Sequence, residues 1–234
     1  MIRCFSKMLV MTVAVAGLAL ANPILDFQVP PSAGGGVVSY GGGSAPLTGS
    51  GIGVSSVTGY NNTPLNNGVL RNCIACTYSF TTGGWQSWNG LIHTFANGGS
   101  LTLTGTIDLN NNGQIDAGDA SGTLLSGVFA GGTQTVVSFA AGATNTLNIV
   151  ASVFSTFVHD SLASFYGLPL QPAQHLGTMN LSFFAPGVPG GSFTSSAIGS
   201  GNILAVTPEP VSILLLGTAL VLCGGLWRRR FPKS

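Results

Sequence analysis

The chain has 234 residues, which suits one domain or at most two small ones. Only 6% of its residues are charged, about a quarter of the usual share, while Gly contributes 35 residues and Ser, Thr and Asn are abundant. The segment between the two ends has one basic residue, Arg71, and five aspartates. Its net charge of about −4 excludes a basic groove for nucleic acid.

The first 21 residues have the parts of a secretory signal peptide. Arg3 and Lys7 form a positive start, and the uncharged apolar run Met8–Leu20 follows. As a helix this run would reach about 20 Å, which is short of a bilayer core. The sequence predicts cleavage by signal peptidase after Ala21, and therefore export across the inner membrane.

Residues 22–66 are expected to be a Gly-rich lead-in. Within them, residues 34–53 include nine glycines separated by small and polar residues. This composition is typical of a flexible segment or a set of turns rather than a packed element. The exported domain itself is expected over residues 67–207.

Strand patterns recur through this domain. Residues 101–109 alternate strictly, with Leu and Ile on one face and mainly Thr on the other, which is typical of a half-buried strand. Further candidates lie at residues 69–80, 123–129, 135–139, 147–158 and 179–183. Because turn residues separate these short runs and no alternation of strand and helix appears, we expect an all-β fold, an antiparallel β-sandwich.

One short helix is expected after the longest of the later strands. Asp160 is the predicted N-cap, residues Ser161–Tyr166 form the helix, and Gly167 ends it. Pro169 follows, where a helix cannot easily continue.

Residues 108–119 have the spacing of a twelve-residue calcium loop. Hard Ca²⁺ needs six or more oxygen ligands, and a Gly at the sixth position, here Gly113, permits the sharp turn. The candidate ligands are Asp108, Asn110, Asn112, Gln114, Asp116 and Asp119. Because Asp replaces Glu at the last position and a strand precedes the loop, it resembles the loops of dockerin-type and other extracellular modules. It predicts a weak structural site, on the order of 10⁻⁴ to 10⁻³ M; the alternative is a turn that binds nothing.

Cys73 and Cys76 are the only cysteines of the exported domain. Cys4 leaves with the signal peptide and Cys223 lies in the tail. A local disulfide is the leading interpretation in an oxidising compartment. The alternatives are free thiols, a redox pair, which would need a helix N-terminus, and a zinc site, which would need more ligands.

Aromatic residues and histidines offer weaker signals. Trp85 and Trp88, with Tyr78, suit either a sugar-stacking platform or core packing, and we favour core packing. The histidines at positions 93, 159 and 175 are scattered and are expected to be ordinary loop or surface residues. No nucleophile or phosphate-binding motif occurs, so no catalytic residue and no enzyme activity are predicted.

The C-terminus combines three features in a fixed order. Pro208-Glu209-Pro210 is followed by the uncharged run 211–227 and then by Arg228, Arg229 and Arg230. Seventeen helical residues reach about 26 Å, enough for a transmembrane helix if the bilayer thins or the arginines snorkel. Arginines beside an apolar helix stay cytoplasmic, which leaves the domain outside, as the signal peptide also requires.

This tail, residues 208–234, resembles the PEP-CTERM sorting signal of Gram-negative bacteria, which is sometimes labelled after ice-binding proteins. The resemblance implies that a membrane-embedded exosortase recognises Pro-Glu-Pro and removes the tail. Proteins with this signal often belong to species that make exopolysaccharide, which suggests an association with that polymer. The chain would be membrane-anchored before processing and then located at the cell surface or outside the cell.

Two functions follow for the exported domain. The first is a non-enzymatic cell-surface or extracellular-matrix protein associated with exopolysaccharide. The second is a calcium-stabilised carbohydrate-binding module that uses Trp85 and Trp88.

Overall fold

The computed structural model describes residues 22–31, 35–129, 135–139, 146–170, 175–186 and 190–207. The predicted signal peptide (1–21) and sorting tail (208–234) lie outside the described residues. Pro23–Thr207 form one compact unit. Within the described ranges, no helix is both long and apolar enough to cross a membrane.

The described part of this unit is built almost entirely from strands, which confirms the predicted all-β class. The strands are β1 (Ile24–Val29), β2 (Val37–Tyr40), β3 (Pro46–Tyr60), β4 (Leu70–Trp88), β5 (Ile92–Phe95), β6 (Gly99–Ile107), β7 (Ala120–Phe129), β8 (Thr135–Phe139), β9 (Thr146–Val158), β10 (His175–Phe184), β11 (Phe193–Thr194) and β12 (Ala197–Val206). The helix α2 (Asp160–Tyr166) follows β9.

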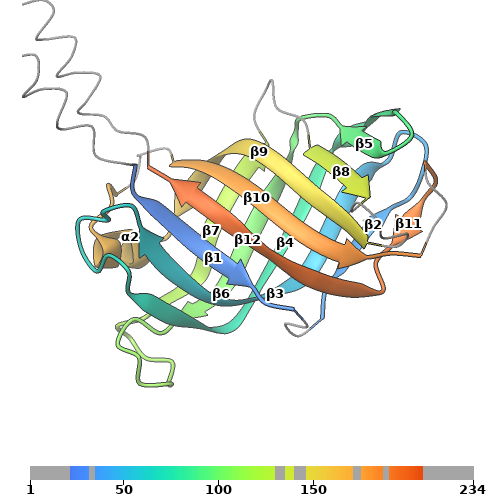
Figure 1. Cartoon of the computed structure of the whole chain (residues 1–234). Coiled ribbons are helices and arrows are strands. Elements are labelled where there is room, and N and C mark those ends of the chain that lie inside the picture. Colours follow the sequence, from blue (N-terminus) through green and yellow to red (C-terminus); the bar gives the residue numbers. More distant parts are fainter. Residues whose placement is uncertain are drawn as a thin grey trace, which may run out of the picture. The chain divides into compact units, whose positions relative to one another are not determined.

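All strands belong to one antiparallel sheet that closes on itself. Their order is β11-β2-β3-β1-β12-β10-β9-β7-β6-β4-β5-β8, and an additional pairing joins β3 to β4. This pairing turns the eight strands from β3 to β4 into a ring. Figure 1 shows β1, β12, β10 and β9 in front of β4, β6 and β7, an arrangement of two layers consistent with a β-sandwich.

Four shorter strands extend the ring at one end. β2 and β11 continue the sheet beyond β3, whereas β5 and β8 continue it beyond β4, and β8 also pairs with β9. β4 pairs with β3 and β6 in the ring and with β5 in the extension. Shifts of register along its length, as β-bulges produce, accompany this change of partner.

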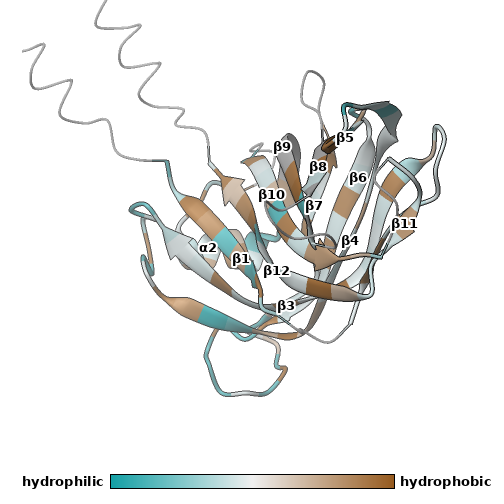
Figure 2. Ribbon diagram, turned by 45° about the vertical axis from the view of Figure 1, so that its right-hand side comes forward, coloured by the Kyte–Doolittle hydropathy of each residue, from teal (hydrophilic) through white to brown (hydrophobic). Residues whose placement is uncertain are grey.

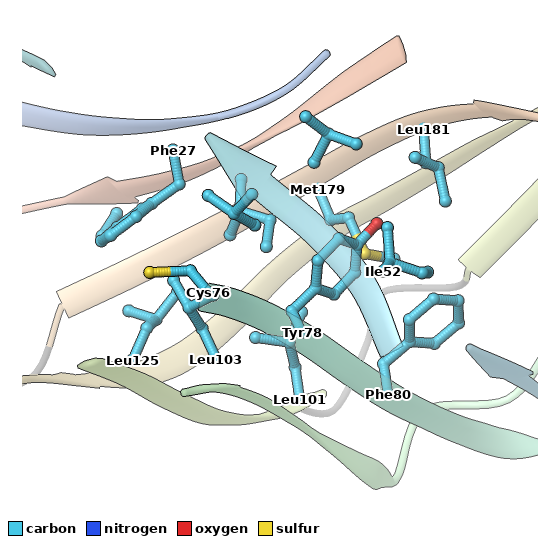
Figure 3. Packing of buried hydrophobic residues seen from close by; sticks show 14 of the residues in the cluster. Phe27, Ile52, Cys76, Tyr78, Phe80, Leu101, Leu103, Leu125, Met179 and Leu181 are labelled. Carbon is cyan, nitrogen blue, oxygen red and sulfur yellow. The ribbon is translucent and has the colours of Figure 1, made fainter. Parts of the chain in front are cut away.

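The core lies between the two layers of the ring. In β10, buried residues alternate with more exposed ones from His175 to Phe184, and Figure 2 shows the same alternation as bands of hydropathy along the strands. Side chains from opposite layers, such as Tyr78 of β4 and Met179 of β10, point toward one another (Figure 3). Full burial of each large apolar side chain stabilises the fold by about 1.5–3 kcal/mol.

The prediction of a flexible lead-in at residues 22–66 is wrong, because β1, β2 and β3 occupy it. β1 lies between β3 and β12, and its Leu25 and Phe27 are fully buried. Some of the glycines have a packing role: Gly49 faces the ring of Phe80, where a Cβ would not fit. Close packing explains only some of these glycines, because a Cβ on Gly35, Gly43 or Gly51 would meet open space.

The predicted helix is present, and it begins one residue earlier than expected. His159, not Asp160, is the N-cap, because its Nδ1 accepts a hydrogen bond from the backbone N–H of Ser161 at 3.2 Å. Gly167 ends the helix in the left-handed conformation, with φ of 72°. The helix buries one side, including Tyr166.

Candidate functional site

The loop between β6 and β7 is closed by two buried aspartates. Asp108, which is 1% exposed, accepts hydrogen bonds from the backbone N–H groups of Asn112 (3.1 Å) and Gly113 (2.7 Å). Asp119, which is 7% exposed, accepts hydrogen bonds from the backbone N–H groups of Leu109 and Asp116, both at 3.0 Å. The two carboxylates therefore tie both ends of the loop to its own backbone.

Asp116 forms a second, exposed centre in the same loop. Its carboxylate accepts hydrogen bonds from the side-chain amides of Asn110 (2.7 Å) and Asn112 (2.9 Å) and from the backbone N–H of Gly118 (3.0 Å). These three hydrogen bonds lower the pKa of Asp116, and the bond from Asn110 has the largest effect. The backbone N–H of Gln114 donates to the side-chain oxygen of Asn112 at 2.7 Å.

The six predicted calcium ligands thus lie in one hydrogen-bonded loop. Their oxygen atoms suit Ca²⁺ chemically. In this structure, however, the carboxylates of Asp108 and Asp119 bind backbone N–H groups, with which an ion would have to compete. Across the described ranges no group of three or more His, Cys, Asp or Glu residues is placed to hold a metal. Calcium binding stays a prediction.

Arg71 fixes the loop beside α2. Its Nε donates to the carbonyl oxygen of Leu109 at 2.8 Å, and its guanidinium carbon lies 4.9 Å from the centroid of the Phe165 ring. An open hollow of about 590 Å³ lies between these segments, lined by Leu109, Asn110, Gly118, Asp160, Ser161, Ser164 and Phe165. It brings an aromatic ring, a carboxylate and two serine residues together.

The two predicted sugar-stacking tryptophans both contact His93. The indole N–H of Trp85 donates to Nδ1 of His93 at 3.3 Å, and the ring centroid of Trp88 lies 4.4 Å from that of His93. His93 is only 1% exposed. Because burial disfavours the charged form, it lowers the pKa of His93.

Further aromatic rings from the added strands complete this cluster. Tyr40, Phe95 and Phe193 lie with their ring centroids 5.4, 6.3 and 5.7 Å from that of His93. Trp85 packs partly buried against the core. The cluster therefore anchors β2, β5 and β11 to the end of β4; Trp85 belongs partly to the core, whereas Trp88 is half-buried beside His93.

Tyr78 does not belong to a surface platform. Its side chain is fully buried and stacks on Phe80 at a centroid distance of 6.1 Å. Its hydroxyl has no hydrogen-bond partner, and burial raises its pKa far above the ordinary value. A stacking surface would have to rely on Trp85 and Trp88 alone.

The structure joins Cys73 and Cys76 in a disulfide, with their Cα atoms 5.6 Å apart. The bond spans a bulge in β4, where the register against β6 shifts between Ile74 and Thr77. Ala75 has a positive φ of 52° in this bulge. The disulfide therefore closes a local distortion of one strand and leaves the link between strands to backbone hydrogen bonds.

Two of the three histidines are buried, contrary to the expectation of loop or surface positions. His93 and His175 are each 1% exposed, and Nδ1 of His175 lies 3.1 Å from the hydroxyl of Thr207. His93 lies in the same phase of β5 as the buried Phe95, but the apolar Ile92 in the opposite phase removes the polar alternation that would have signalled this burial.

Comparison of the chain with protein-family models, with curated proteins and with solved structures finds no match.

Proposed function

We propose that the chain is an exported, non-enzymatic protein of the cell surface or extracellular matrix that associates with exopolysaccharide. The observation that supports this proposal is the small number of charged side chains in the closed sheet. Residues 27–70, 72–107 and 120–159 contain no charged side chain, and Asp108 and Asp119 are buried. A surface that presents hydroxyl, amide, backbone and apolar groups with few charges suits an uncharged polymer better than a charged partner.

The two ends of the chain supply the route. Signal peptidase would cut after Ala21, and the apolar helix 211–227 would hold the chain while exosortase acts at Pro208–Pro210. The positive residues before the first apolar run and after the second support the same orientation.

Fractionation of bacteria that express the intact gene tests this proposal. We expect the mature chain to begin at Asn22 and to appear in the envelope and then in the matrix. Glu209→Ala should hold it in the membrane, whereas Asp160→Asn, a change of an exposed charge in α2, should not. A cytosolic chain that keeps its leader would refute export.

A calcium-stabilised carbohydrate-binding module is the second candidate. The hollow beside α2 favours it, because aromatic rings pack on the apolar faces of sugars while polar groups such as Asp160 and Ser164 hydrogen-bond their hydroxyls. In this proposal the ion would stabilise the loop that forms one wall of the hollow.

Calorimetry of the full chain with CaCl₂ tests calcium binding, and the absence of heat at millimolar calcium would refute it. Saturable binding of a polysaccharide should then weaken in Phe165→Ala if the hollow binds sugar, or in Trp85→Ala and Trp88→Ala if the tryptophans do. Because both tryptophans contact His93, thermal unfolding of each variant must be measured in parallel.

A further inference from the structure

Ser and Thr side chains stand in register across the outer side of three neighbouring strands, β4, β6 and β7. Thr102 and Thr104 of the central strand β6 each pair directly with a Ser or Thr of β4 on one side and of β7 on the other. The two rows are Thr77–Thr104–Thr123 and Ser79–Thr102–Ser126. We call these six residues the hydroxyl face; the next row has Thr81 and Ser100 but ends in β7 at the exposed, apolar Val128.

The alternation of the strands sets this arrangement. Tyr78 lies between the two β4 positions and Leu103 between the two β6 positions, and both are fully buried. Because successive side chains of a strand point to opposite faces, the hydroxyl residues must point outward. Neighbouring strands lie about 4.8 Å apart and alternate residues about 6.7 Å apart, which sets the spacing of the hydroxyl groups.

The hydroxyl face has no charge on it or close to it in the sequence. Its strands fall within residues 72–107 and 120–159, which contain no Asp, Glu, Lys or Arg. Arg71, just before them, is engaged with the Leu109 carbonyl and the Phe165 ring. An anionic or cationic polymer would therefore gain no electrostatic attraction here. A face without charged side chains is suited to an uncharged partner.

Most of these hydroxyl groups are available for a ligand. Ser79 accepts a hydrogen bond from the backbone N–H of Gly51 at 3.1 Å. Within the described part of the chain, the side chains of the other five members form no hydrogen bond to protein. Each hydroxyl can donate once and accept twice, as sugar hydroxyls also do.

We infer that the hydroxyl face binds a neutral polysaccharide chain laid along its rows. This inference rests on the proposed function and names the surface and the ligand class. The strand spacing is comparable to the length of one sugar ring, so successive rings can meet successive strands. Because each sugar hydroxyl only replaces a water molecule, single contacts gain little, and binding needs many contacts along a polymer.

The shape of the sheet favours a flexible chain over a rigid crystal surface. The ring of strands is closed, and twist and closure curve its outer side. A register shift between Leu103 and Thr104 also displaces the two rows relative to each other. A crystal lattice would meet few of these groups at once, whereas a polymer can follow the curve.

The opposite layer provides a matched comparison. Its outer side carries exposed apolar residues, among them Leu176 and Phe184, and a half-buried Asp26 bonded to Gln28 and Asn202. Thr178 of β10 lies on this outer side beside Leu204. It is a threonine of similar setting that lies outside the hydroxyl face.

Affinity electrophoresis of the purified full chain in mild detergent tests the inference. The gels contain the exopolysaccharide of the producing bacterium, neutral dextran, neutral galactomannan or anionic alginate. We expect a neutral polymer to retard the chain, with an affinity that rises with polymer length and does not change with salt. Retardation by alginate alone, or by none of the polymers, would overturn the inference, as would activity on ice crystals without polymer binding.

Variants then locate the contact. Combined replacement of Thr77, Thr102, Thr104 and Thr123 by Val keeps the shape and removes the hydroxyls, and we expect about a tenfold or larger loss of affinity. Thr178→Val should bind as the unchanged chain does. If the combined variant fails to unfold cooperatively, Thr104→Glu alone, which places a charge in the middle row, should give the same loss.

The two proposals fail in different ways. If the unchanged chain is absent from envelope and matrix, the proposed function fails. If the chain reaches the matrix and binds polymer there, but the Thr→Val and Thr104→Glu variants bind equally well, only the hydroxyl face is refuted.

Discussion

The indole N–H of Trp85 donates its hydrogen bond to Nδ1 of His93, and this bond fixes the protonation state of a buried imidazole. Because an indole nitrogen can only donate, Nδ1 must present a lone pair, so the ring is neutral. Protonation would set two donors against each other inside an aromatic cluster. The geometry and the lowered pKa of His93 therefore agree.

Acidification should destabilise the fold below about pH 6.5. A histidine whose pKa is lower in the folded chain binds protons preferentially when unfolded, so its contribution is complete above the unfolded pKa and falls as the pH drops below it. Burial lowers the pKa values of both His93 and His175, so both act in this direction. Thermal unfolding at about pH 7.5 and about pH 5 measures the effect.

Two histidine variants assign this pH dependence. His93→Gln keeps an acceptor for Trp85 without a titrating ring and should reduce the fall in Tm, and His175→Asn, which removes the second buried titrating ring, should reduce it as well. Asp26, whose pKa burial raises, acts in the opposite direction at lower pH, so the measurement stays above about pH 5. A Tm that rises on acidification would contradict the assignment.

Gly105 should tolerate no side chain. It has a φ of 143°, and a Cβ there would lie 2.6 Å from both Cα and Sγ of Cys76. Gly105→Ala should lower the free energy of unfolding by about 3 kcal/mol or more, through the backbone conformation and the clash together. Gly122→Ala, at φ of 104° but in open space, should cost only about 1–2 kcal/mol. Equal costs in urea unfolding would show that the clash does not matter.

The disulfide between Cys73 and Cys76 should stabilise the fold modestly. It closes a very short loop, and the entropy of loop closure gives about 2 kcal/mol, or about 4–8 °C in Tm. Dithiothreitol should lower the Tm of the unchanged chain but not that of the Cys73→Ala, Cys76→Ala double variant. Intact mass before and after reduction and alkylation reports the bond itself; two alkylated thiols before reduction would show that it is absent.

Local patterns revealed the strands, and distant pairing determined how they assemble. The alternation at residues 101–109 and 179–183 was readable because a half-buried strand needs only its own period of two. The place of β1 between β3 and β12 was not, since it depends on pairing Ile24 with Val206. For the same reason the closure of the ring by β3 and β4 has no sequence signal.

For the candidate sites as well, local spacing was readable in the sequence, whereas contacts between distant residues were not. The spacing of residues 108–119 predicted a calcium loop or, as the alternative, a turn that binds nothing, and it could not show that Asp108 and Asp119 would bind the backbone of that loop. The hydroxyl face was also invisible in sequence, because Thr77, Thr104 and Thr123 meet only through the register of three strands. A pattern on one strand does not indicate which residues of other strands lie beside it.

Removal of the Tyr78 hydroxyl should stabilise the fold. A buried hydroxyl without a partner pays its desolvation without regaining a hydrogen bond, so Tyr78→Phe should raise the free energy of unfolding by about 1 kcal/mol, or about 2–4 °C in Tm. Tyr166→Phe is the matched control, because its hydroxyl donates to the carbonyl oxygen of Val69 at 2.8 Å and its loss should cost about 0.5–1.5 kcal/mol. Both changes remove one oxygen from a buried tyrosine, so opposite signs isolate the partner as the cause. A loss of stability in Tyr78→Phe would mean that its hydroxyl is hydrogen-bonded in solution, to water or to a ligand inside the ring of strands.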